Sequence, residues 1–248
     1  MTPAAPPPRG APVLRAVDLA KSYGSGETRF DALKGVSLDV RRGESLAIVG
    51  RSGSGKSTLM HLLALLDRPN AGRIEVDGED VAGAGARTLN RLRNERFGFV
   101  FQQFFLTAQQ SVLENVTLPL LVAGVAPRER TRRGMAVLES LGLADKARNR
   151  ATDLSGGQKQ RVVIARALVN EPDVIFADEP TGNLDSATGR QVEDLLFGLQ
   201  RDRGITLVVV THDEELAARC DRRITIADGR IIAPSDATAS LVTEGAAR

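Results

Sequence analysis

The stretch GRSGSGKST at residues 50–58 has the composition and spacing of a phosphate-binding loop. Gly50 and Gly55 let backbone N–H groups turn inward around a phosphate, and a helix that starts there adds its positive end. Lys56 would bridge the β- and γ-phosphates of a nucleoside triphosphate, and Ser57 would ligate Mg²⁺. A glycine-rich turn that merely contains a lysine is the alternative. The loop follows a predicted strand and opens a predicted helix, which favours the phosphate-binding interpretation.

The stretch DVIFADEP at residues 173–180 places two adjacent carboxylates at the end of a predicted buried strand. Ligands of open α/β sheets bind at the carboxyl ends of the strands. We therefore expect Asp178 to hold Mg²⁺ through water and Glu179 to orient and deprotonate an attacking water. Taken alone, the two acids could equally cap the next helix. The phosphate loop upstream favours the catalytic interpretation.

A second glycine turn, LSGGQ at residues 154–158, also runs directly into an apolar helical pattern. The N-terminus of such a helix favours an anion, because its free N–H groups and dipole point towards it. The chain thus has two predicted phosphate-binding turns, and these patterns leave open which phosphate the second turn binds.

The two histidines and the single cysteine are rare residue types that could have structural or functional roles. His212 follows ITLVVVT and stands at the end of a predicted buried strand, where a histidine can be structural or catalytic. His61 lies inside the helix after the phosphate loop, and we expect it to be structural. Cys220 is the single cysteine, which excludes an internal disulfide and predicts a small, semi-buried residue.

The elements that must position these groups alternate between helices and strands from residue 157 onward. This alternation predicts an α/β fold with a mostly parallel sheet covered on both faces. Short alternating runs over residues 13–40 predict antiparallel strands, and residues 223–232 predict a final hairpin. The helix after the phosphate loop is expected over about residues 57–66, because Pro69 prevents its continuation.

Residues 87–150 change character and have mostly helical spacing, with only FGFVFQ extended. Five of the eight phenylalanines fall in this stretch, between residues 97 and 105. Three of them share one face of the predicted strand and are expected in the core, namely Phe97, Phe99 and Phe101. Phe104 and Phe105 break that alternation.

Length and composition suit one large α/β domain, since 248 residues with 42% hydrophobic content can bury a core. The 33 Lys and Arg nearly balance the 31 Asp and Glu, so charge gives no argument for a nucleic-acid partner. We expect a disordered lead-in over residues 1–12, one domain over 13–235 and a short tail over 236–248. The proline-rich start has no apolar segment of a signal peptide, and no apolar run reaches the roughly 20 residues that span a bilayer. We therefore expect a cytoplasmic chain whose membrane role, if any, comes through a partner.

In chain order, the phosphate loop, the glutamine of VFQQ, LSGGQ, ADEP, NLD and TH resemble the motif series of the ATP-binding cassette (ABC) ATPases, over about residues 13–232. The resemblance implies a P-loop NTPase core with an N-terminal antiparallel β subdomain, a helical subdomain inserted over about residues 87–165, and Mg²⁺-dependent ATP hydrolysis. In that family the LSGGQ turn closes over the ATP held by a second, head-to-tail cassette. The second glycine turn would therefore serve a partner cassette's ATP, in a dimer that sandwiches two nucleotides.

The resemblance also gives matching positions a role. Tyr23 would stack on adenine, although a tyrosine near a strand end can simply be edge packing. Gln102 would sense Mg²⁺ and the attacking water, Asp185 would communicate across the dimer, and His212 would contact the γ-phosphate. The expected catalytic groups are Glu179, His212, Gln102 and Lys56, and the expected metal ligands are Ser57, Gln102 and Asp178. The expected nucleotide contacts are Tyr23, Gly50, Ser52, Gly53, Ser54, Gly55, Lys56, Ser57, Thr58, Ser155, Gly156, Gly157, Gln158 and Asp185.

Within the family, FGFVFQQF, LENVTLPL and FADEPTGNLDS resemble the branch of lipoprotein-release and macrolide-exporter systems. This branch implies a separate membrane permease as partner and a place on the cytoplasmic face of the membrane. A further hypothesis is that Phe104 and Phe105 line a groove for a permease helix, with burial inside the helical insert as the alternative. A soluble ABC ATPase acting on nucleic acid or ribosomes is the alternative function. A P-loop kinase would not account for LSGGQ.

Overall fold

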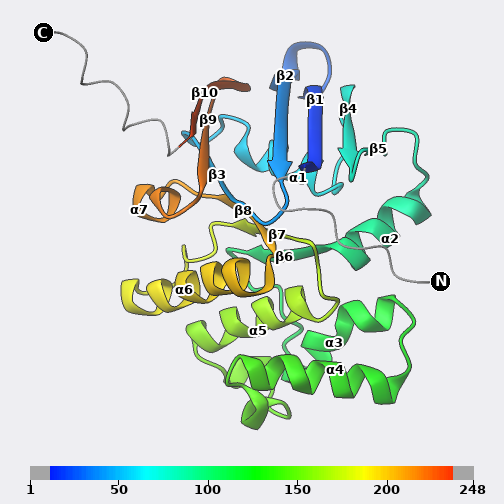
Figure 1. Cartoon of the computed structure of the whole chain (residues 1–248), viewed down its shortest axis with the longest axis vertical. Helices are drawn as coiled ribbons and strands as arrows, with labels where there is room; N and C mark the ends of the chain where they lie inside the picture. Colours follow the sequence, from blue (N-terminus) through cyan, green and yellow to red (C-terminus); the bar gives the residue numbers. More distant parts are fainter. Residues whose placement is uncertain (1–11, 237–248) are drawn as a thin grey trace, which may run out of the picture.

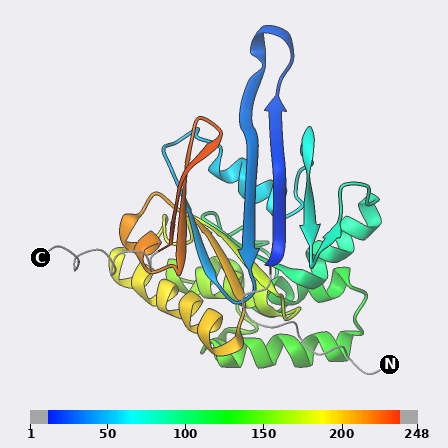
Figure 2. The same ribbon diagram turned by 45° about the horizontal axis from the view of Figure 1, so that its top comes forward.

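The computed structural model describes residues 12–236 and contains two sheets (Figure 1). The predicted lead-in and tail lie outside the described residues, apart from Pro12 and Asp236. The first sheet is antiparallel, in the order β2-β1-β4-β5. Its strands are β1 (Pro12–Tyr23), β2 (Phe30–Arg41), β4 (Ala71–Val76) and β5 (Glu79–Asp80). As predicted for residues 13–40, β1 and β2 form an antiparallel hairpin, which stands out from the body in Figure 2.

The second sheet has the order β10-β9-β3-β8-β7-β6 and is parallel except at β10. Its strands are β3 (Ser45–Val49), β6 (Phe97–Phe101), β7 (Val174–Asp178), β8 (Thr206–Val210), β9 (Arg222–Ala227) and β10 (Arg230–Asp236). Every residue of β3 and β8 is buried, as the continuous apolar runs of a doubly covered parallel sheet require. The predicted final hairpin is β9 and β10.

Seven helices of the described residues cover this sheet or extend from it: α1 (Lys56–Leu63), α2 (Ala86–Arg96), α3 (Val112–Val122), α4 (Pro127–Ser140), α5 (Gly156–Leu168), α6 (Ser186–Arg203) and α7 (Glu214–Ala218). Short 3₁₀ turns lie at Gly26–Thr28, Ala144–Lys146 and Ala151–Asp153. Helix α1 ends three residues before the predicted position. Leu65 has a φ of 58°, so the chain has already left the helical conformation well before Pro69.

Two hydrophobic cores lie on opposite faces of the parallel sheet, as the alternation of side chains along a strand requires. In β3, Ala47 and Val49 pack in the core beneath α3, α5 and α6, whereas Leu46 and Ile48 pack in the core shared with α1 and the antiparallel sheet. One sheet therefore holds both the helical layer and the β subdomain in place. Figure 1 shows α3, α4, α5 and α6 together on one side of the sheet.

The predicted core position of three phenylalanines is confirmed. Phe97 packs edge-on against Phe176 with ring centroids 5.4 Å apart, and Phe99 stacks on Phe176 at 5.9 Å. Phe101 packs on the same core from the same face of β6. The small Gly98 faces the other way and lets α5 approach, because an added Cβ would lie 2.7 Å from the carbonyl oxygen of Ala167.

Candidate nucleotide-binding site

Three neighbouring strands, β3, β7 and β8, end at the same edge of the sheet and carry the predicted chemistry there. The phosphate loop follows β3, Asp178 and Glu179 close β7, and His212 lies just after β8. Direct links cross this edge, since the Glu179 N–H donates to the Val210 carbonyl at 2.9 Å. The sheet topology thus brings together residues that are far apart in the sequence.

The conformation of the phosphate loop depends on its glycines. Gly50 has a φ of 154°, and an added Cβ would lie 2.2 Å from the carbonyl oxygen of Ile226. Gly55 has a φ of 108° and precedes α1, where an added Cβ would lie 2.5 Å from the carbonyl oxygen of Ala32. Because Cβ atoms do not approach backbone oxygens so closely, these two positions admit only glycine without a shift of the loop.

Polar groups in the loop fit a phosphate ligand. The Lys56 ammonium donates to the carbonyl oxygens of Gly50 and Arg51, at 2.9 and 3.0 Å, and so stays over the loop. The Ser54 hydroxyl is buried without a hydrogen-bond partner among the described residues. A buried polar atom without a partner is costly, and a bound anion with its hydration would satisfy it. Ser57 and Thr58 continue into the first turn of α1.

Asp178 and Glu179 have different surroundings. Burial raises the pKa of the Asp178 carboxyl above its usual value, against the opposing fields of His61 and Lys56. His61 is therefore a neighbour of this carboxylate. Glu179 has a φ of 46°, a conformation that few residues other than glycine adopt. Hydrogen bonds hold its carboxylate in one orientation.

The Glu179 carboxylate accepts hydrogen bonds from both residues that follow β8. Its Oε2 accepts from the Thr211 hydroxyl at 3.2 Å, and its Oε1 accepts from the His212 N–H at 3.1 Å. The His212 Nδ1 lies 2.7 Å from the same Oε1. This hydrogen bond is the main reason that the pKa of His212 is raised above 6.5. Thr211 was not among the residues predicted from the sequence, although it stands beside His212 at the same strand end.

Gln102 follows β6 and is connected to the loop between β7 and α6. The Asn183 side-chain amide donates to the Gln102 carbonyl oxygen at 2.8 Å, and the Gln102 amide lies 3.4 Å from the Asn183 Oδ1. Gly182 in this loop lies against the Gln102 side chain, where an added Cβ would lie 2.8 Å from Nε2 and would displace the end of that side chain. The predicted sensor glutamine is therefore attached to the segment that begins at Glu179.

The second glycine turn caps α5. The Ser155 hydroxyl accepts from the Gln158 N–H, and the Gln158 side chain accepts from the Ser155 N–H at 3.0 Å. Gly157 lies against α6, where an added Cβ would lie 2.5 Å from the Thr188 methyl group, and Gly156 lies near Leu184. This turn and the first turn of α6 therefore form one surface.

Asp185 caps α6 on that surface. Its carboxylate accepts from the backbone N–H groups of Ala187 and Thr188 at 3.1 and 3.0 Å. A hydrogen bond with the Thr188 side chain is the largest cause of the lowered pKa of Asp185, and the backbone bonds from Thr188 and Ala187 add to it. In this chain the contacts of Asp185 are those of a helix cap.

Tyr23 ends β1 beside the phosphate-loop helix. Its hydroxyl donates to Asp67 at 2.9 Å, and 41% of the residue is exposed. Burial is the largest cause of its raised pKa, and a hydrogen bond with Thr58 opposes this. The Lys21 ammonium lies 5.0 Å from the ring centroid, in the arrangement of a cation–π contact. An exposed ring next to the phosphate loop is suitably placed for a base to stack on it.

The chain matches a known protein family. The family model described as ABC transporter matches residues 33–182. The chain belongs to the ABC transporter family. It is 48% identical over 221 residues to a lipoprotein-releasing system ATP-binding protein LolD from Geobacter metallireducens, which covers 89% of this chain and 98% of that relative.

Other members of the family agree with this result. The chain is 48% identical to the macrolide export ATP-binding/permease protein MacB of Escherichia coli strain K12, of which it covers 34%. A dimeric structure of the ABC cassette MJ0796, in a post-hydrolysis state with ADP and Pi, superposes with a TM-score of 0.82 at 39% identity and covers 90% of this chain and 98% of that one.

The predicted fold and activity are confirmed by these matches. The chain is an ATP-binding and ATP-hydrolysing ABC transporter subunit with an α/β P-loop core, an antiparallel β subdomain and a helical subdomain. The alternative of an ABC ATPase acting on nucleic acid or ribosomes is not favoured, because the relatives named above are transporter proteins. Within residues 12–236, no helix is long and apolar enough to cross a membrane.

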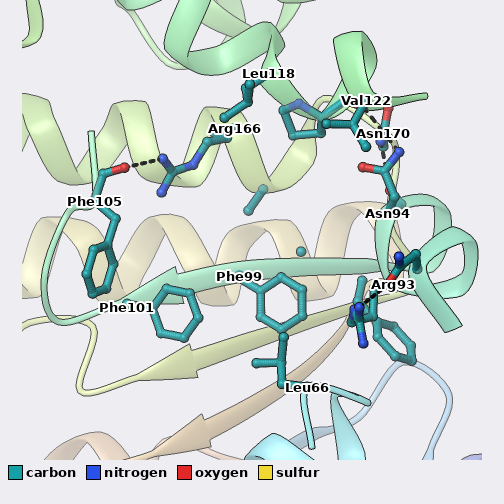
Figure 3. Close-up of a pocket in the computed structure, with 15 residues that line it drawn as sticks. Leu66, Arg93, Asn94, Phe99, Phe101, Phe105, Leu118, Val122, Arg166 and Asn170 are labelled. Carbon is teal, nitrogen blue, oxygen red and sulfur yellow. Dashed lines mark hydrogen bonds between the residues drawn. The ribbon is translucent and has the colours of Figure 1, made fainter. Parts of the chain in front are cut away.

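The helical subdomain of this ABC cassette borders an open apolar groove (Figure 3). It has a volume of about 510 Å³ and lies between α2, β6, α3 and α5. Phe105 lines it, is 64% exposed and packs edge-on against Phe101 at 5.7 Å. Phe104 instead packs on the core beneath the sheet. The structure thus separates the two phenylalanines: Phe105 is at the groove, and Phe104 follows the alternative of burial.

Proposed function

We propose that this subunit hydrolyses Mg²⁺-bound ATP in a head-to-tail dimer of cassettes and transmits the resulting motion to a separate membrane permease. The observation that carries the proposal is the position of Glu179, which is held at the sheet edge by two groups that follow β8, the strand between β7 and the strand that leads into the phosphate loop. A carboxylate fixed in this way is suited to accept a proton from an attacking water.

In this mechanism the loop N–H groups and Lys56 bind the phosphates, and the positive end of α1 stabilises their charge. Glu179 orients a water for attack in line with the leaving group and accepts its proton. His212 contacts the γ-phosphate, and Gln102 senses Mg²⁺ and the attacking water.

Ser57, Asp178 and Gln102 would hold Mg²⁺ in this site. These oxygen donors suit Mg²⁺, whose ligands in proteins are usually one or two carboxylates together with waters and substrate phosphates. In residues 12–236 no group of three or more His, Cys, Asp or Glu side chains forms a metal cage, so the phosphates and waters would complete the coordination. When bound, Mg²⁺ neutralises phosphate charge as the transition state forms.

The second nucleotide contact would come from a partner cassette. Ser155, Gly156, Gly157 and Gln158 would close over the γ-phosphate bound by the partner, and Asp185 would lie at the same interface. The exposed N-terminus of α5 supports this role, since its dipole favours an anion. The dimeric MJ0796 structure is of a relative with the same fold.

The permease would bind in the groove beside α3, and the subunit would thereby lie on the cytoplasmic face of the membrane. Five of the eight exposed large hydrophobic side chains in the described residues line this groove or extend its α3 rim: Leu66, Phe105, Leu118, Leu121 and Val122. Such a concentration of apolar surface is typical of a protein interface, and a groove between helices accepts an amphipathic helix. The relative MacB, an ATP-binding/permease protein, supports a permease as partner.

A pulldown from membranes tests the proposed partner. The Glu179→Gln protein, with ATP and Mg²⁺, should retain a permease that mass spectrometry identifies. Phe105→Ala should reduce that retention, because it removes an exposed ring from the groove. The matched control is Ile232→Ala, because Ile232 is an apolar residue outside the groove and is 63% exposed. Unchanged retention by Phe105→Ala would contradict docking in this groove, and recovery of ribosomal proteins alone would contradict the transporter role.

A further inference from the structure

Thr211 has a contact with the proposed catalytic carboxylate that the motifs do not explain. It is 1% exposed and directly follows β8, which lies between β3 and β7 in the sheet. Its N–H donates to the Ile48 carbonyl oxygen on β3 at 3.3 Å. Its hydroxyl lies 3.2 Å from the Glu179 Oε2. The residue is therefore fixed to the strand of the phosphate loop and touches the acid that closes β7.

The direction of this hydroxyl is determined by its neighbours. The Thr211 oxygen accepts a hydrogen bond from the Asp213 N–H at 3.0 Å. Its single proton is then available to an acceptor, and an ionised carboxylate can only accept. The proton consequently points to the Glu179 Oε2. Because Asp213 also caps α7 through Glu215 and Leu216, the accepting side of the hydroxyl is held by a helix.

The other oxygen of the Glu179 carboxylate has a more mobile partner. Oε1 is bound by the backbone N–H and the ring of His212, whose side chain is 79% exposed. An imidazole so exposed can rotate towards a phosphate without moving the core. The buried Thr211 hydroxyl has no such freedom. Of the two side-chain contacts to this carboxylate, the bond from Thr211 is therefore the one that stays when the His212 ring turns to the nucleotide.

We propose that Thr211 is a positioning residue for ATP hydrolysis, whose hydroxyl holds the Glu179 carboxylate in the orientation that accepts a proton from water. The inference rests on the proposed role of Glu179. No bond forms or breaks at Thr211, which only fixes one carboxylate rotamer. Misplacement of a catalytic group by about 1 Å can lower a rate by about a hundredfold, so one buried hydrogen bond of this kind can matter.

The chain contains a matched control on the same strand. Thr206 begins β8, is 0% exposed and accepts a hydrogen bond from the Gly43 N–H at 3.0 Å. Thr206→Val and Thr211→Val thus each remove one buried threonine hydroxyl, the first at the start of β8 and the second directly after its end. A loss of stability common to both variants shows the structural part of the effect, which thermal unfolding measures.

Steady-state ATP hydrolysis by the full chain, measured over a range of ATP concentrations, tests the inference. Thr211→Val should lower kcat by about 10- to 100-fold with KM for ATP unchanged, Thr211→Ser should recover most of the rate, and Thr206→Val should keep the wild-type rate. In the Glu179→Gln background, Thr211→Val should cause no further loss, because both changes disable one group.

Three results would overturn the inference. A kcat for Thr211→Val equal to that of Thr206→Val would show that the hydroxyl is only structural. An equal loss in the Glu179→Gln background would show that Thr211 does not act through Glu179. Both results leave the role of Glu179 intact. A wild-type rate in Glu179→Gln alone would instead refute the proposed role of Glu179, and the inference with it.

Discussion

Glu179 combines backbone strain with a fully engaged carboxylate. Its φ of 46° is a conformation that costs of the order of 1–3 kcal/mol for a residue other than glycine. The strain directs the side chain from the end of β7 towards the residues after β8. Strain of this kind persists where surrounding bonds fix it, and here the bonds to Val210, Thr211 and His212 do so. We interpret the conformation as preorganisation of the proposed base.

The pKa of His212 provides a test of this arrangement. Its hydrogen bond to Glu179 raises that pKa, so Glu179→Gln should lower it towards 6.5 in an NMR titration of the imidazole. The pair stabilises the fold at pH values below 6.5, and this contribution disappears as pH rises through the raised pKa. Its size is small, because His212 is exposed to solvent. The His212→Ala variant identifies the resonance, and an unchanged pKa in Glu179→Gln would show that the two side chains do not interact in solution.

At the residue scale, the sequence predicted the polar groups but not their partners. Lys56, Asp178 and Glu179 could be predicted because a loop, a strand end and a spacing define them. The bond from Thr211 to Glu179 depends on the register between β7 and β8, and the bond between Gln102 and Asn183 depends on how two loops meet. Neither relation has a period or a composition in the sequence.

The elements of the fold were largely predictable, since each has a local physical cause. Apolar runs predicted the buried strands, and alternating helices and strands predicted the parallel sheet. The glycines of the sequence located the phosphate loop. The structure shows why they are needed, because backbone oxygens of Ile226 and Ala32 occupy the space that a Cβ would take at Gly50 and Gly55. The end of α1 and the different fates of Phe104 and Phe105 were not predictable, because both depend on packing against elements distant in sequence.

The contact between β6 and α5 depends on a single glycine at the groove. Gly98→Ala should push α5 from the sheet, because the added Cβ would meet the Ala167 carbonyl oxygen at 2.7 Å. Overpacking of this kind costs about 1–3 kcal/mol, and each kcal/mol lowers Tm by about 2–4 °C in a domain of this size. Gly83→Ala is the control, since nothing lies within 4 Å of its Cβ position. Equal unfolding temperatures for both variants would contradict the close packing described here.

In the whole molecule, four charged side chains join the subdomains on the side of the parallel sheet where β7 begins. Arg42 and Arg96 both pair with Asp77 and with Asp173, which closes a ring of ion pairs. Asp77 lies in the turn between β4 and β5, whereas Arg96 ends α2 and Asp173 precedes β7. This ring links the antiparallel sheet, the parallel sheet and the start of the helical subdomain. It was not predicted, because its members are separated by up to 131 residues.

A mixture of two inactive variants distinguishes an active site shared by two chains, as in the proposed dimer, from an active site contained in one chain. Lys56→Ala disables the phosphate loop, and Ser155→Arg blocks the second glycine turn, so each variant alone should be inactive. A mixture should regain ATPase activity, because a mixed dimer has one site with an intact loop and an intact partner turn. Sites contained in one chain would give no recovery, since each chain would then carry a defect in its own site. Gel filtration with ATP confirms that dimers form, and a pulldown through an affinity tag on one variant confirms that they are mixed.

The rate of ATP hydrolysis by Glu179→Gln tests the central claim most directly, because that claim assigns the chemistry to the carboxylate at the sheet edge. The substitution keeps the shape of the side chain and removes its ability to accept a proton. We predict a loss of roughly 10²- to 10⁴-fold in kcat, with ATP binding retained. A wild-type rate, with ATP bound as tightly as before, would contradict the role of Glu179 as the base.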